Sequence, residues 1–381
     1  MRFDVAVVGL GGMGSAIAAH CARRGASVIG LEQFESTHDL GSSSGKSRMI
    51  RKAYFEDAAY VPLLLRAYDL WRELERKTDT ELLRITGLLM VGEEETEIIA
   101  GACRAARQHS LQLESLSARQ ITARYPTLKV LEREVGVFES DGGVLDPEAC
   151  VQAHLRVASA AGAEMHFGVA MKGWEKTNTG FQLELGDGTK VESRTLVFSL
   201  GAWFKEAFEK VGIRMQVQRN VQAWFQPTTN EYGADRFPPF LLNRRGLPAP
   251  LYGFPDFGDG VKAAFHSHGD LTDAALLVRK IDEERDIAPI VRAMADWMPG
   301  AAGAFRAAKP CPYSLTPDRN FVVDRHPEHP NLVLCGGFSG HGFKFAPVIG
   351  EICADLALEN ESRHQIDFLS LRRFATGADH K

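Results

Sequence analysis

The sequence has few cysteines, and their spacing gives no metal-binding or disulfide motif. Six cysteines are spread over 381 residues, and no two of them form a Cys-x-x-Cys pair. We therefore expect neither a metal site nor a disulfide framework. The first residues enter an apolar strand without the charged, apolar and cleavage regions of a signal peptide. The compartment that we expect is therefore the reducing cytoplasm.

Long apolar runs and an excess of one charge are also missing. No stretch of about 20 apolar residues is present, so we expect no membrane-spanning helix. The 44 Lys and Arg residues nearly balance the 49 Asp and Glu residues, which leaves a net charge of −5. Nucleic-acid-binding proteins are usually basic, so we expect no nucleic-acid partner. Hydrophobic residues make up 45% of the chain, too many for a disordered protein, and the length indicates about two domains.

Glycine, by contrast, is abundant. It makes up 36 of the 381 residues, or about 9%, against a usual share of about 7%. Gly9, Gly11 and Gly14 form a Gly-x-Gly-x-x-Gly motif between an expected strand at 4–8 and an expected helix at about 15–24. This spacing permits a tight turn, close approach of backbone to a pyrophosphate and close packing of helix on strand. The start of the helix would face the negative charge of the phosphates.

An acidic residue completes this motif. Residues 28–31 are typical of a second parallel strand, which stops at Glu32. A carboxylate at this point hydrogen-bonds ribose hydroxyls and disfavours the 2′-phosphate of NADP. Gly12 and Met13, inside the turn, are further candidate cofactor contacts. The motif predicts a dinucleotide site and leaves NAD and FAD open.

Several later segments have the apolar spacing of helices or strands. Residues 186–188 form a turn that predicts a β-hairpin with the alternating residues 181–185. The remaining expected helices are 60–75, 93–108, 146–161, 282–297 and 346–358, and the remaining expected strands are 87–92, 195–200 and 332–334.

Three segments resemble monomeric sarcosine oxidase and N-methyltryptophan oxidase, which are FAD-dependent amine oxidases of the D-amino-acid-oxidase-like superfamily. They are the loop 41–54, the segment 252–266, and the C-terminal residues 311–318 followed by 337–345. The resemblance extends from the first strand to about residue 358, nearly the whole chain.

The resemblance implies an α/β fold. A Rossmann-like, doubly wound FAD-binding domain is expected to be interleaved with a substrate domain built mainly on an antiparallel sheet. We expect residues 1–88, 145–214 and 310–381 in the FAD-binding domain. The substrate domain would comprise residues 89–144 and 215–309.

The cofactor implied by the resemblance is FAD, held through a covalent thioether between the flavin 8α-methyl group and Cys311. A free cysteine is otherwise most often an ordinary buried residue, and only the flanking sequence distinguishes Cys311. Backbone amides near 340–342 and the helix after them could stabilise negative charge on the flavin ring. The further expected cofactor contacts are Gly41, Ser42, Ser44, Ser47, Arg48, Val169, Gly201, Trp203, Gly337, Ser339, Gly340, His341, Gly342 and Lys344.

Basic residues give the expected substrate site. Arginine makes two parallel hydrogen bonds to a carboxylate, and the resemblance implies that Arg51 and Lys344 hold the substrate carboxylate. Arg48 is implied to lie close to the flavin ring. A solvated surface position is the better interpretation of Lys46 and Lys52.

Three other residues complete the expected catalytic set. The resemblance places Lys262 beside the flavin, where a preorganised cation stabilises the charge that forms on oxygen. It implies that Tyr252 and His266 shape the pocket and modulate amine binding. A lone histidine on a strand is more often structural, so a direct acid–base role for His266 is the weaker interpretation.

These residues together predict FAD-dependent oxidation of a secondary amine that carries a carboxylate, an N-methyl or cyclic amino acid. Hydride would pass to flavin N5, the imine would hydrolyse, and molecular oxygen would reoxidise the flavin and give hydrogen peroxide. The alternatives are a flavin amine dehydrogenase with another acceptor, an NAD-dependent dehydrogenase and a flavoprotein without turnover.

The sequence departs from the family pattern in two places. Ser43 and Ser44 stand where the family often has two histidines, and Lys46 replaces a common acidic residue. Residues 239–246, in the expected substrate cap, do not match the sarcosine enzymes closely. The identity and stereochemistry of the amine and the oligomeric state stay open.

Overall fold

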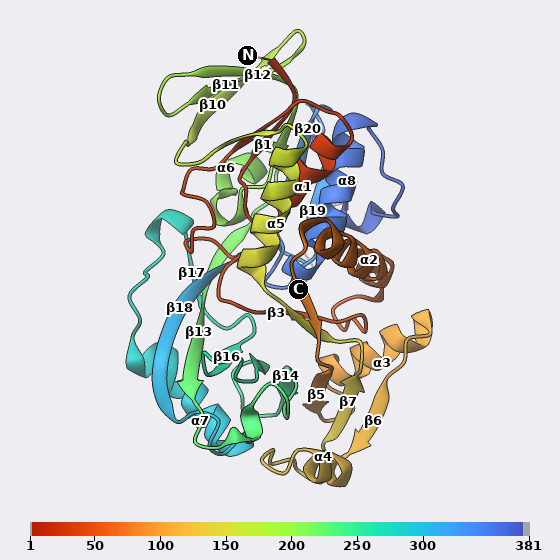
Figure 1. Ribbon diagram of the computed structural model, residues 1–381, viewed down its shortest axis with the longest axis vertical. Helices are drawn as coiled ribbons and strands as arrows, with labels where there is room; N and C mark the ends of the chain where they lie inside the picture. Colours follow the sequence, from red (N-terminus) through yellow and green to blue (C-terminus); the bar gives the residue numbers. More distant parts are fainter. Residues whose placement is uncertain (1, 376–381) are drawn as a thin grey trace.

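The computed structural model describes residues 2–375, which form two large sheets joined by long strands (Figure 1). The parallel centre of the first sheet has the order β20-β12-β1-β2-β9. Its apolar central strands are buried on both faces, as in doubly wound folds. The strands are β1 (Arg2–Val8), β2 (Val28–Leu31), β9 (Glu164–His166), β12 (Lys190–Phe198) and β20 (Leu332–Gly336).

Antiparallel strands extend this sheet at one side. β10 (Met171–Thr177), β11 (Gly180–Leu185) and β12 form a meander, and β19 (Val322–Arg325) pairs with β20. The turn between β11 and β12 lies where the sequence predicts a hairpin.

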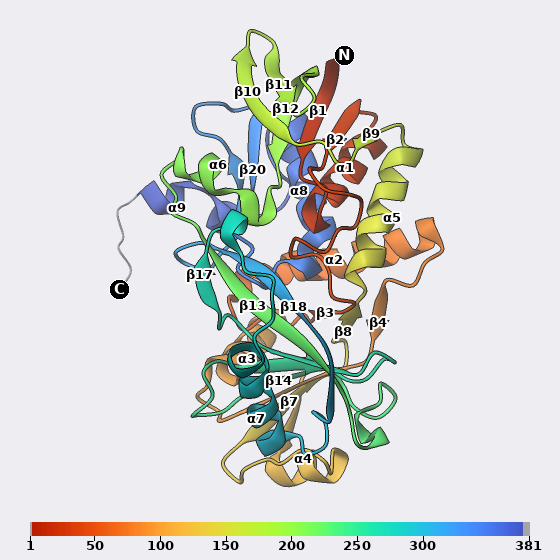
Figure 2. The same cartoon turned by 90° about the vertical axis from the view of Figure 1, so that its left-hand side faces the viewer.

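Helices cover the first sheet. One hydrophobic core joins its strands to α1 (Gly12–Arg23), α2 (Val61–Thr78), α5 (Pro147–Ala160) and α8 (Ala346–Leu358). The short helix α6 (Lys205–Glu209) lies on the opposite side of the sheet (Figure 2). Helix α5 begins as its sequence predicts, because the Asp146 carboxylate accepts a hydrogen bond from the amide of Ala149 (2.9 Å) and Pro147 opens the first turn.

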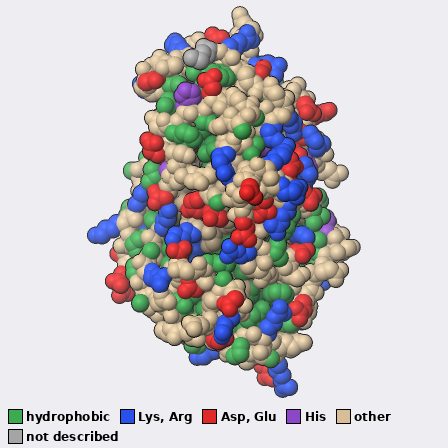
Figure 3. Space-filling model, viewed as in Figure 1, with side chains coloured by type: hydrophobic (Ala, Val, Ile, Leu, Met, Phe, Trp, Pro, Cys, Tyr) green, Lys and Arg blue, Asp and Glu red, His purple; other side chains and the backbone are tan. Residues whose placement is uncertain are grey.

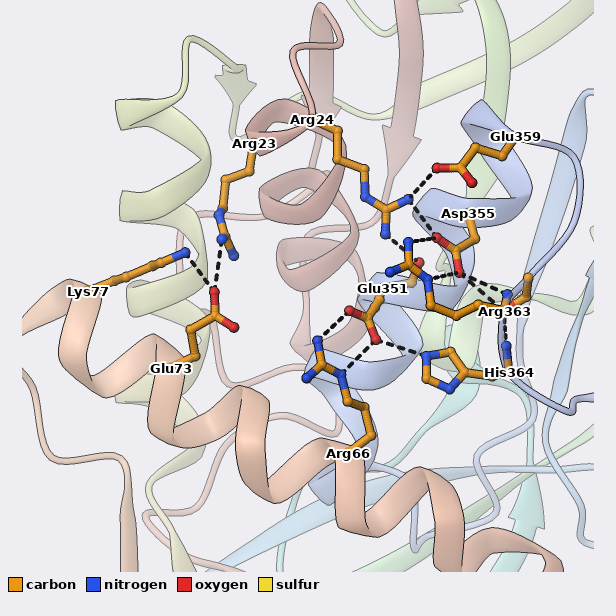
Figure 4. A network of polar contacts seen from close by, with 11 residues as sticks. Arg23, Arg24, Arg66, Glu73, Lys77, Glu351, Asp355, Glu359, Arg363 and His364 are labelled. Atoms are coloured by element: carbon orange, nitrogen blue, oxygen red, sulfur yellow. Dashed lines mark hydrogen bonds and ion pairs between the residues drawn. The ribbon is translucent and has the colours of Figure 1, made fainter.

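Carboxylates on α8 tie three other segments to it (Figure 4). Glu351 accepts hydrogen bonds from Arg66 on α2 (2.7 Å) and from the His364 ring (2.8 Å). Asp355 pairs with Arg24 at the end of α1 (2.6 Å) and with Arg363 (3.0 Å). Burial opposes ionisation of both carboxyls, but these hydrogen bonds hold the pKa values of Glu351 and Asp355 below their ordinary values.

The second sheet has the order β17-β13-β16-β15-β14-β5-β7-β6, with β18 on the other side of β13. All of its pairs are antiparallel except β14 with β5. Its strands are β5 (Leu88–Gly92), β6 (Glu114–Ser117), β7 (Val135–Glu139), β13 (Gln216–Gln226), β14 (Phe240–Asn243), β15 (Leu251–Phe254), β16 (Val261–Phe265), β17 (Asp270–Thr272) and β18 (Ala304–Leu315). Helices α3 (Glu97–His109), α4 (Ala118–Arg124) and α7 (Ala288–Trp297) pack around it.

The long strands β13 and β18 run from the second sheet toward the first (Figures 1 and 2). A small sheet of β3 (Arg48–Ile50), β8 (Gly143–Leu145) and β4 (Leu83–Ile85) lies between the two large ones. β18 is continuous across residue 310, the expected start of the last FAD-binding segment. We propose the two interleaved domains with the ranges given above, and with β18 reaching from one into the other.

The fold confirms the predicted class, a doubly wound α/β domain interleaved with a mainly antiparallel sheet. Several helices differ from their expected ranges. Helix α1 begins at Gly12 rather than at about residue 15, and α2 extends to Thr78 rather than to residue 75. Helix α3 begins at Glu97, because Thr96 is its N-cap and closes a turn with Glu93 (3.0 Å). The first turn of the segment 282–297 is a π-helix, Glu283–Ile287. Between residues 2 and 375, no helix combines the length and apolar character needed to cross a membrane.

Candidate active site

A cavity of about 1210 Å³ runs from the first glycine turn to the strands of the second sheet. Its walls include backbone amides, aromatic rings and cations from both halves of the molecule. Nineteen residues that the sequence predicts as site residues line it, namely Gly9, Gly11, Gly12, Met13, Glu32, Gly41, Ser42, Arg48, Arg51, Val169, Gly201, Trp203, Tyr252, His266, Cys311, Gly340, His341, Gly342 and Lys344.

Six predicted site residues do not line this cavity, namely Gly14, Ser44, Ser47, Lys262, Gly337 and Ser339. Packing explains why two of these positions, Gly14 and Gly337, are occupied by glycine. A Cβ on Gly14 would lie 1.7 Å from the carbonyl oxygen of Gly9, and one on Gly337 would lie 2.3 Å from the Thr316 methyl group. The hydroxyl of Ser339 donates to the carbonyl of Gly337 (3.1 Å). Their cofactor roles stay predictions.

The dinucleotide end of the cavity is built as the motif predicts. Gly9 has φ +89°, and a Cβ there would lie 2.3 Å from the Ser199 carbonyl oxygen. Gly11 is the N-cap of α1, and Gly11, Gly12 and Met13 line the cavity, so the start of this helix lies at the cavity wall. The hydroxyl of Ser43 accepts the amide of Gly12 (3.0 Å). This arrangement can bind the negative charge of a pyrophosphate.

Glu32 is buried beside this turn. Its carboxylate accepts hydrogen bonds from the amides of Leu10 (2.9 Å) and Phe34 (3.1 Å). Desolvation opposes ionisation, but hydrogen bonds from His38 and these amides lower the pKa of Glu32. The charged carboxylate keeps lone pairs free for ribose hydroxyls.

The loop after Gly41 connects the two sheets. The hydroxyl of Ser42 donates to the carbonyl of Pro312 on β18 (2.5 Å). Arg48 donates to carbonyls within its own loop, those of Ser42 (2.7 Å), Ser44 and Ser47 (2.8 Å). Its guanidinium lies 3.9 Å from the sulfur of Cys311. A cation and a thiol, 263 positions apart in the chain, therefore meet at one point of the cavity wall.

Lys262 lies behind this loop rather than in the cavity wall. Its ammonium donates to the carbonyls of Gly45 (2.8 Å) and Ser47 (2.9 Å) and to the Ser47 hydroxyl (3.2 Å). The side chain is buried, and the rings of Phe254 and Trp224 lie 5.0 and 5.3 Å from its nitrogen. Desolvation and the nearby Arg48 cation lower the pKa of Lys262 well below its ordinary value.

Arg51 and Lys344 both lie against the ring of Tyr54. The guanidinium carbon of Arg51 is 4.8 Å from the centre of the Tyr54 ring, and the Lys344 nitrogen is 5.2 Å from it. Arg51 donates to both carboxylate oxygens of Glu56 (2.6 Å each), and Lys344 donates to the His341 carbonyl (2.6 Å). The buried Nε of Arg51 has no hydrogen-bond partner among the described residues. The pair therefore forms a cationic pocket with donor capacity to spare.

Charge balance in this pocket depends on Glu56. Burial would raise the pKa of Glu56, but Arg51, His341 and Lys344 lower it to about 2. Desolvation and Arg51 lower the pKa of Lys344 well below its ordinary value. A carboxylate bound here would add a negative charge beside Lys344 and Arg51, which favours the protonated form of Lys344.

His341 supports the pocket through its ring. Its Nδ1 lies 2.5 Å from the Tyr54 hydroxyl and its Nε2 lies 3.1 Å from the Arg319 carbonyl. Burial lowers the pKa of His341 to about 3, so the ring is neutral and donates one hydrogen bond while accepting the other. The side chain thus orients Tyr54, the ring against which both cations lie.

Aromatic residues of the second sheet form the facing wall. The hydroxyls of Tyr252 and Tyr313 lie 3.5 Å apart, and the His266 ring centre is 6.0 Å from that of Tyr313. Desolvation raises the pKa of both tyrosines, so they stay neutral hydroxyl donors. Burial lowers the pKa of His266 to about 4, so its ring is uncharged at neutral pH.

Sequence reasoning missed Tyr54, Glu56 and Tyr313. All three line the cavity or orient groups that do. Tyr54 and Tyr313 lie within the segments that carry the resemblance, so position could have marked them. Glu56 follows Arg51 by five residues, and that close pairing of opposite charges was the available signal.

These features fit FAD. The helix start and Glu32 supply groups that can hold a dinucleotide, and Cys311 and Arg48 line the same cavity. Among residues 2–375, no group of three or more His, Cys, Asp or Glu side chains could hold a metal ion.

The chain is similar to characterised oxidases over almost its full length. Residues 4–356 match the family model of the FAD dependent oxidoreductases (DAO). The chain is 42% identical to a monomeric sarcosine oxidase of Streptomyces avermitilis, with 98% of each chain covered. It is 32% identical to an N-methyl-L-tryptophan oxidase of Salmonella dublin, with 98% of this chain and all of that one covered.

Solved structures agree with this assignment. The open form of NikD, an unusual amino acid oxidase essential for nikkomycin biosynthesis, superposes with a TM-score of 0.86 at 25% identity over 97% of each chain. A glycine oxidase of Geobacillus kaustophilus shares the fold with a TM-score of 0.80 at 20% identity, over 97% of this chain and 98% of that one. The chain therefore belongs to the family of FAD-dependent amine oxidases that includes monomeric sarcosine oxidase and N-methyl-L-tryptophan oxidase.

Proposed function

We propose that the chain oxidises a secondary amine that carries a carboxylate, an N-methyl or cyclic amino acid, with molecular oxygen as acceptor and hydrogen peroxide as product. The observation that carries this proposal is the pair of buried cations, Arg51 and Lys344, against the Tyr54 ring. The names of the relatives, sarcosine oxidase and N-methyl-L-tryptophan oxidase, support substrates of this class.

The substrate carboxylate would bind between Arg51 and Lys344. Arginine offers a planar pair of donors, and its unpartnered Nε is one of them. Glu56 occupies Arg51 in the absence of substrate, so binding requires the carboxylate to compete with Glu56 for this guanidinium. Fixing the carboxylate fixes the neighbouring carbon and nitrogen, which lowers the barrier by positioning.

The amine would face the wall of Tyr252, Tyr313 and His266. The tyrosine hydroxyls are neutral and can donate or accept hydrogen bonds. Because the His266 ring is uncharged above a pH of about 4, it adds no positive charge beside the amine. A neutral amine is the form that can be oxidised, and this wall favours it over an ammonium only weakly, by burial.

FAD would be held by the first glycine turn, Glu32, the loop 41–48 and Cys311, and when bound it supplies the acceptor for two electrons from the carbon next to nitrogen. We propose a thioether link at Cys311, since its sulfur lines the cavity and lies 3.9 Å from Arg48.

Lys262 would supply positive charge for the reaction with oxygen. Its ammonium is fixed by three hydrogen bonds in a buried position beside the Arg48 loop. A preorganised cation in a low-dielectric site stabilises a new negative charge strongly, because no reorganisation is needed.

Substrate screening tests the proposal. Purified enzyme is incubated with sarcosine, N-methyl amino acids with larger side chains, and cyclic amino acids such as proline, while peroxide release is measured. We expect peroxide with at least one carboxylate-bearing secondary amine and none with the matching amine that lacks a carboxylate. Anaerobic bleaching of the flavin without peroxide in air would favour a dehydrogenase. A yellow protein that no amine bleaches would favour a flavoprotein without turnover, and a colourless protein that reduces NAD would contradict the cofactor.

A further inference from the structure

The turn between Ser44 and Arg48 has backbone polar groups on two sides. Gly45 and Lys46 both have left-handed backbone angles, φ +105° and +64°, and the amide of Ser47 donates to the Gly45 carbonyl (2.7 Å). A Cβ on Gly45 would lie 2.5 Å from the Gln222 amide oxygen and 3.5 Å from the Lys262 nitrogen. Glycine is therefore required here, and the turn lies directly against Lys262.

The inner side of this turn accepts hydrogen bonds from Lys262. The ammonium donates to the carbonyls of Gly45 and Ser47, as described above. The outer side of the turn presents two consecutive amides, those of Gly45 and Lys46. Consecutive amides in such a turn form a concave site for an anion.

The anion in this site is the carboxylate of Glu148. Its Oε1 accepts the Gly45 amide (2.7 Å), and its two oxygens lie 3.3 and 3.2 Å from the Lys46 amide. Glu148 stands in the first turn of α5, which is fixed by the Asp146 N-cap and by packing on the first sheet. A rigid helix thus holds the turn from outside while the turn holds Lys262 from inside.

The charges around Lys262 are unevenly matched. Burial is the main effect that opposes protonation of Lys262, and the cations of Arg48 on β3 and Lys309 on β18 add to it, whereas Cys311 and Glu148 favour protonation. The rings of Trp224 on β13 and Phe254 on β15 complete its surroundings. A Cys311 in thioether linkage would carry no charge, which leaves the Glu148 carboxylate to balance two cations.

We infer that Glu148 is a positioning residue for Lys262, because it fixes the turn whose carbonyls orient the ammonium and places a negative charge beside that turn. This inference rests on the proposed role of Lys262 in the reaction with oxygen. Nothing in it requires Glu148 to contact substrate or cofactor.

A role limited to helix α5 is the simpler account of Glu148. An acidic residue in the first turn stabilises a helix through its dipole. Asp146, two residues earlier, caps the same helix through the amide of Ala149, so Asp146→Asn is a matched control for loss of charge at this helix end.

Hydrogen exchange tests the positioning role without turnover. In the holoenzyme, Glu148→Gln should speed exchange of the Gly45 and Lys46 amides about tenfold, because a charge-assisted acceptor is replaced by a weaker one. Asp146→Asn should leave these two amides unchanged and affect α5 instead. Unchanged exchange at Gly45 and Lys46 in Glu148→Gln would overturn the inference.

The pH dependence of the reaction between substrate-reduced enzyme and oxygen tests the electrostatic role. Protonated Lys262 promotes the reaction, so the rate constant falls as the pH rises through the pKa of Lys262. In Glu148→Gln this fall should occur at a pH lower by about half a unit or more. The rate constant for anaerobic reduction by substrate should change less than about twofold. An unshifted profile would contradict the inference and leave the proposed function intact. A wild-type enzyme that does not react with oxygen would refute the proposed acceptor, and the exchange result would still decide whether Glu148 holds the turn.

Discussion

The Nη2 atom of Arg51 lies 2.6 Å from each carboxylate oxygen of Glu56, at the place where a substrate carboxylate would bind. Both side chains are largely removed from water, so neither charge is stable there alone. Glu56 therefore neutralises the charge of Arg51, and an anionic substrate would take over part of this role.

Loss of Arg51 should weaken binding of carboxylate substrates. Charge-assisted hydrogen bonds contribute about 1.5–3 kcal/mol each, so we expect Arg51→Ala to raise KM roughly 10- to 100-fold. Arg66→Ala is the control, because Arg66 pairs with Glu351 on helix α8. Steady-state kinetics over a range of substrate concentrations measures the effect. An unchanged KM would mean that the substrate is anchored elsewhere or is not an acid.

Loss of Glu56 should have the opposite effect on simple carboxylates. In Glu56→Gln the guanidinium of Arg51 no longer has a charged partner, so an incoming carboxylate meets less competition. We expect the Kd of acetate to fall roughly threefold to tenfold, measured by the change in flavin absorption on titration. Weaker acetate binding in this variant would show that Glu56 supports the carboxylate site instead of competing for it.

The sequence predicted much of this site because its signals are local. The first glycine turn and Glu32 lie within one strand–helix–strand unit, and both line the cavity as expected. Arg51 and Cys311 were identified by their flanking residues. What the sequence could not show were contacts across the fold. The sulfur of Cys311 lies near Arg48, 263 positions away.

Lys262 illustrates the same limit. Its position on a strand beside aromatic residues was predictable, but its three hydrogen bonds go to a loop more than 200 positions earlier. The glycines near the C-terminus show a different limit. Gly340 and Gly342 were expected to contact the cofactor, and in the structure a Cβ on Gly340 would also strike the ring of Tyr313, and one on Gly342 that of Phe338. An excess of glycine does not distinguish a ligand from a neighbouring side chain.

The proposed covalent link at Cys311 would be visible by eye. Acid precipitation of the wild-type protein should give a yellow pellet, because a thioether survives denaturation. Cys311→Ser should release the flavin to the supernatant and leave a colourless pellet. Cys103→Ser, a partly exposed cysteine on helix α3, should behave like the wild type. Free flavin in the wild-type supernatant would refute the link.

Replacement of Lys262 should separate the two halves of the reaction. In Lys262→Met the fixed ammonium is lost, and we expect the rate constant for oxygen to fall about 100-fold, with a much smaller change in anaerobic reduction by substrate. Stopped-flow absorbance measures both steps. Lys77→Met is the control, because Lys77 on helix α2 pairs with Glu73 at 2.7 Å and is partly exposed. Equal losses in both steps would argue against a specific role in the oxygen reaction.

A buried histidine outside the cavity should make the fold sensitive to acid. His154 on α5 packs against Trp71 at 5.4 Å, and neither ring nitrogen has a hydrogen-bond partner among the described residues. Burial, with a smaller contribution from His20, lowers the pKa of His154 to about 3. The unfolded chain has an ordinary histidine pKa of about 6.5.

The sign of the effect follows from proton uptake. Between pH 6.5 and 3 the unfolded state binds a proton at His154 that the folded state does not, so the free energy of unfolding falls as the pH falls. From pH 7 to pH 5 this amounts to about 2 kcal/mol, at about 1.4 kcal/mol per pH unit below 6.5. His154→Leu should remove this loss, so its denaturant midpoint should fall less on acidification than that of the wild type. His268→Leu, at an exposed histidine, is the control and should retain the wild-type acid sensitivity. Equal sensitivity in all three proteins would mean that His154 is protonated in the folded state or that other groups dominate the loss of stability in acid.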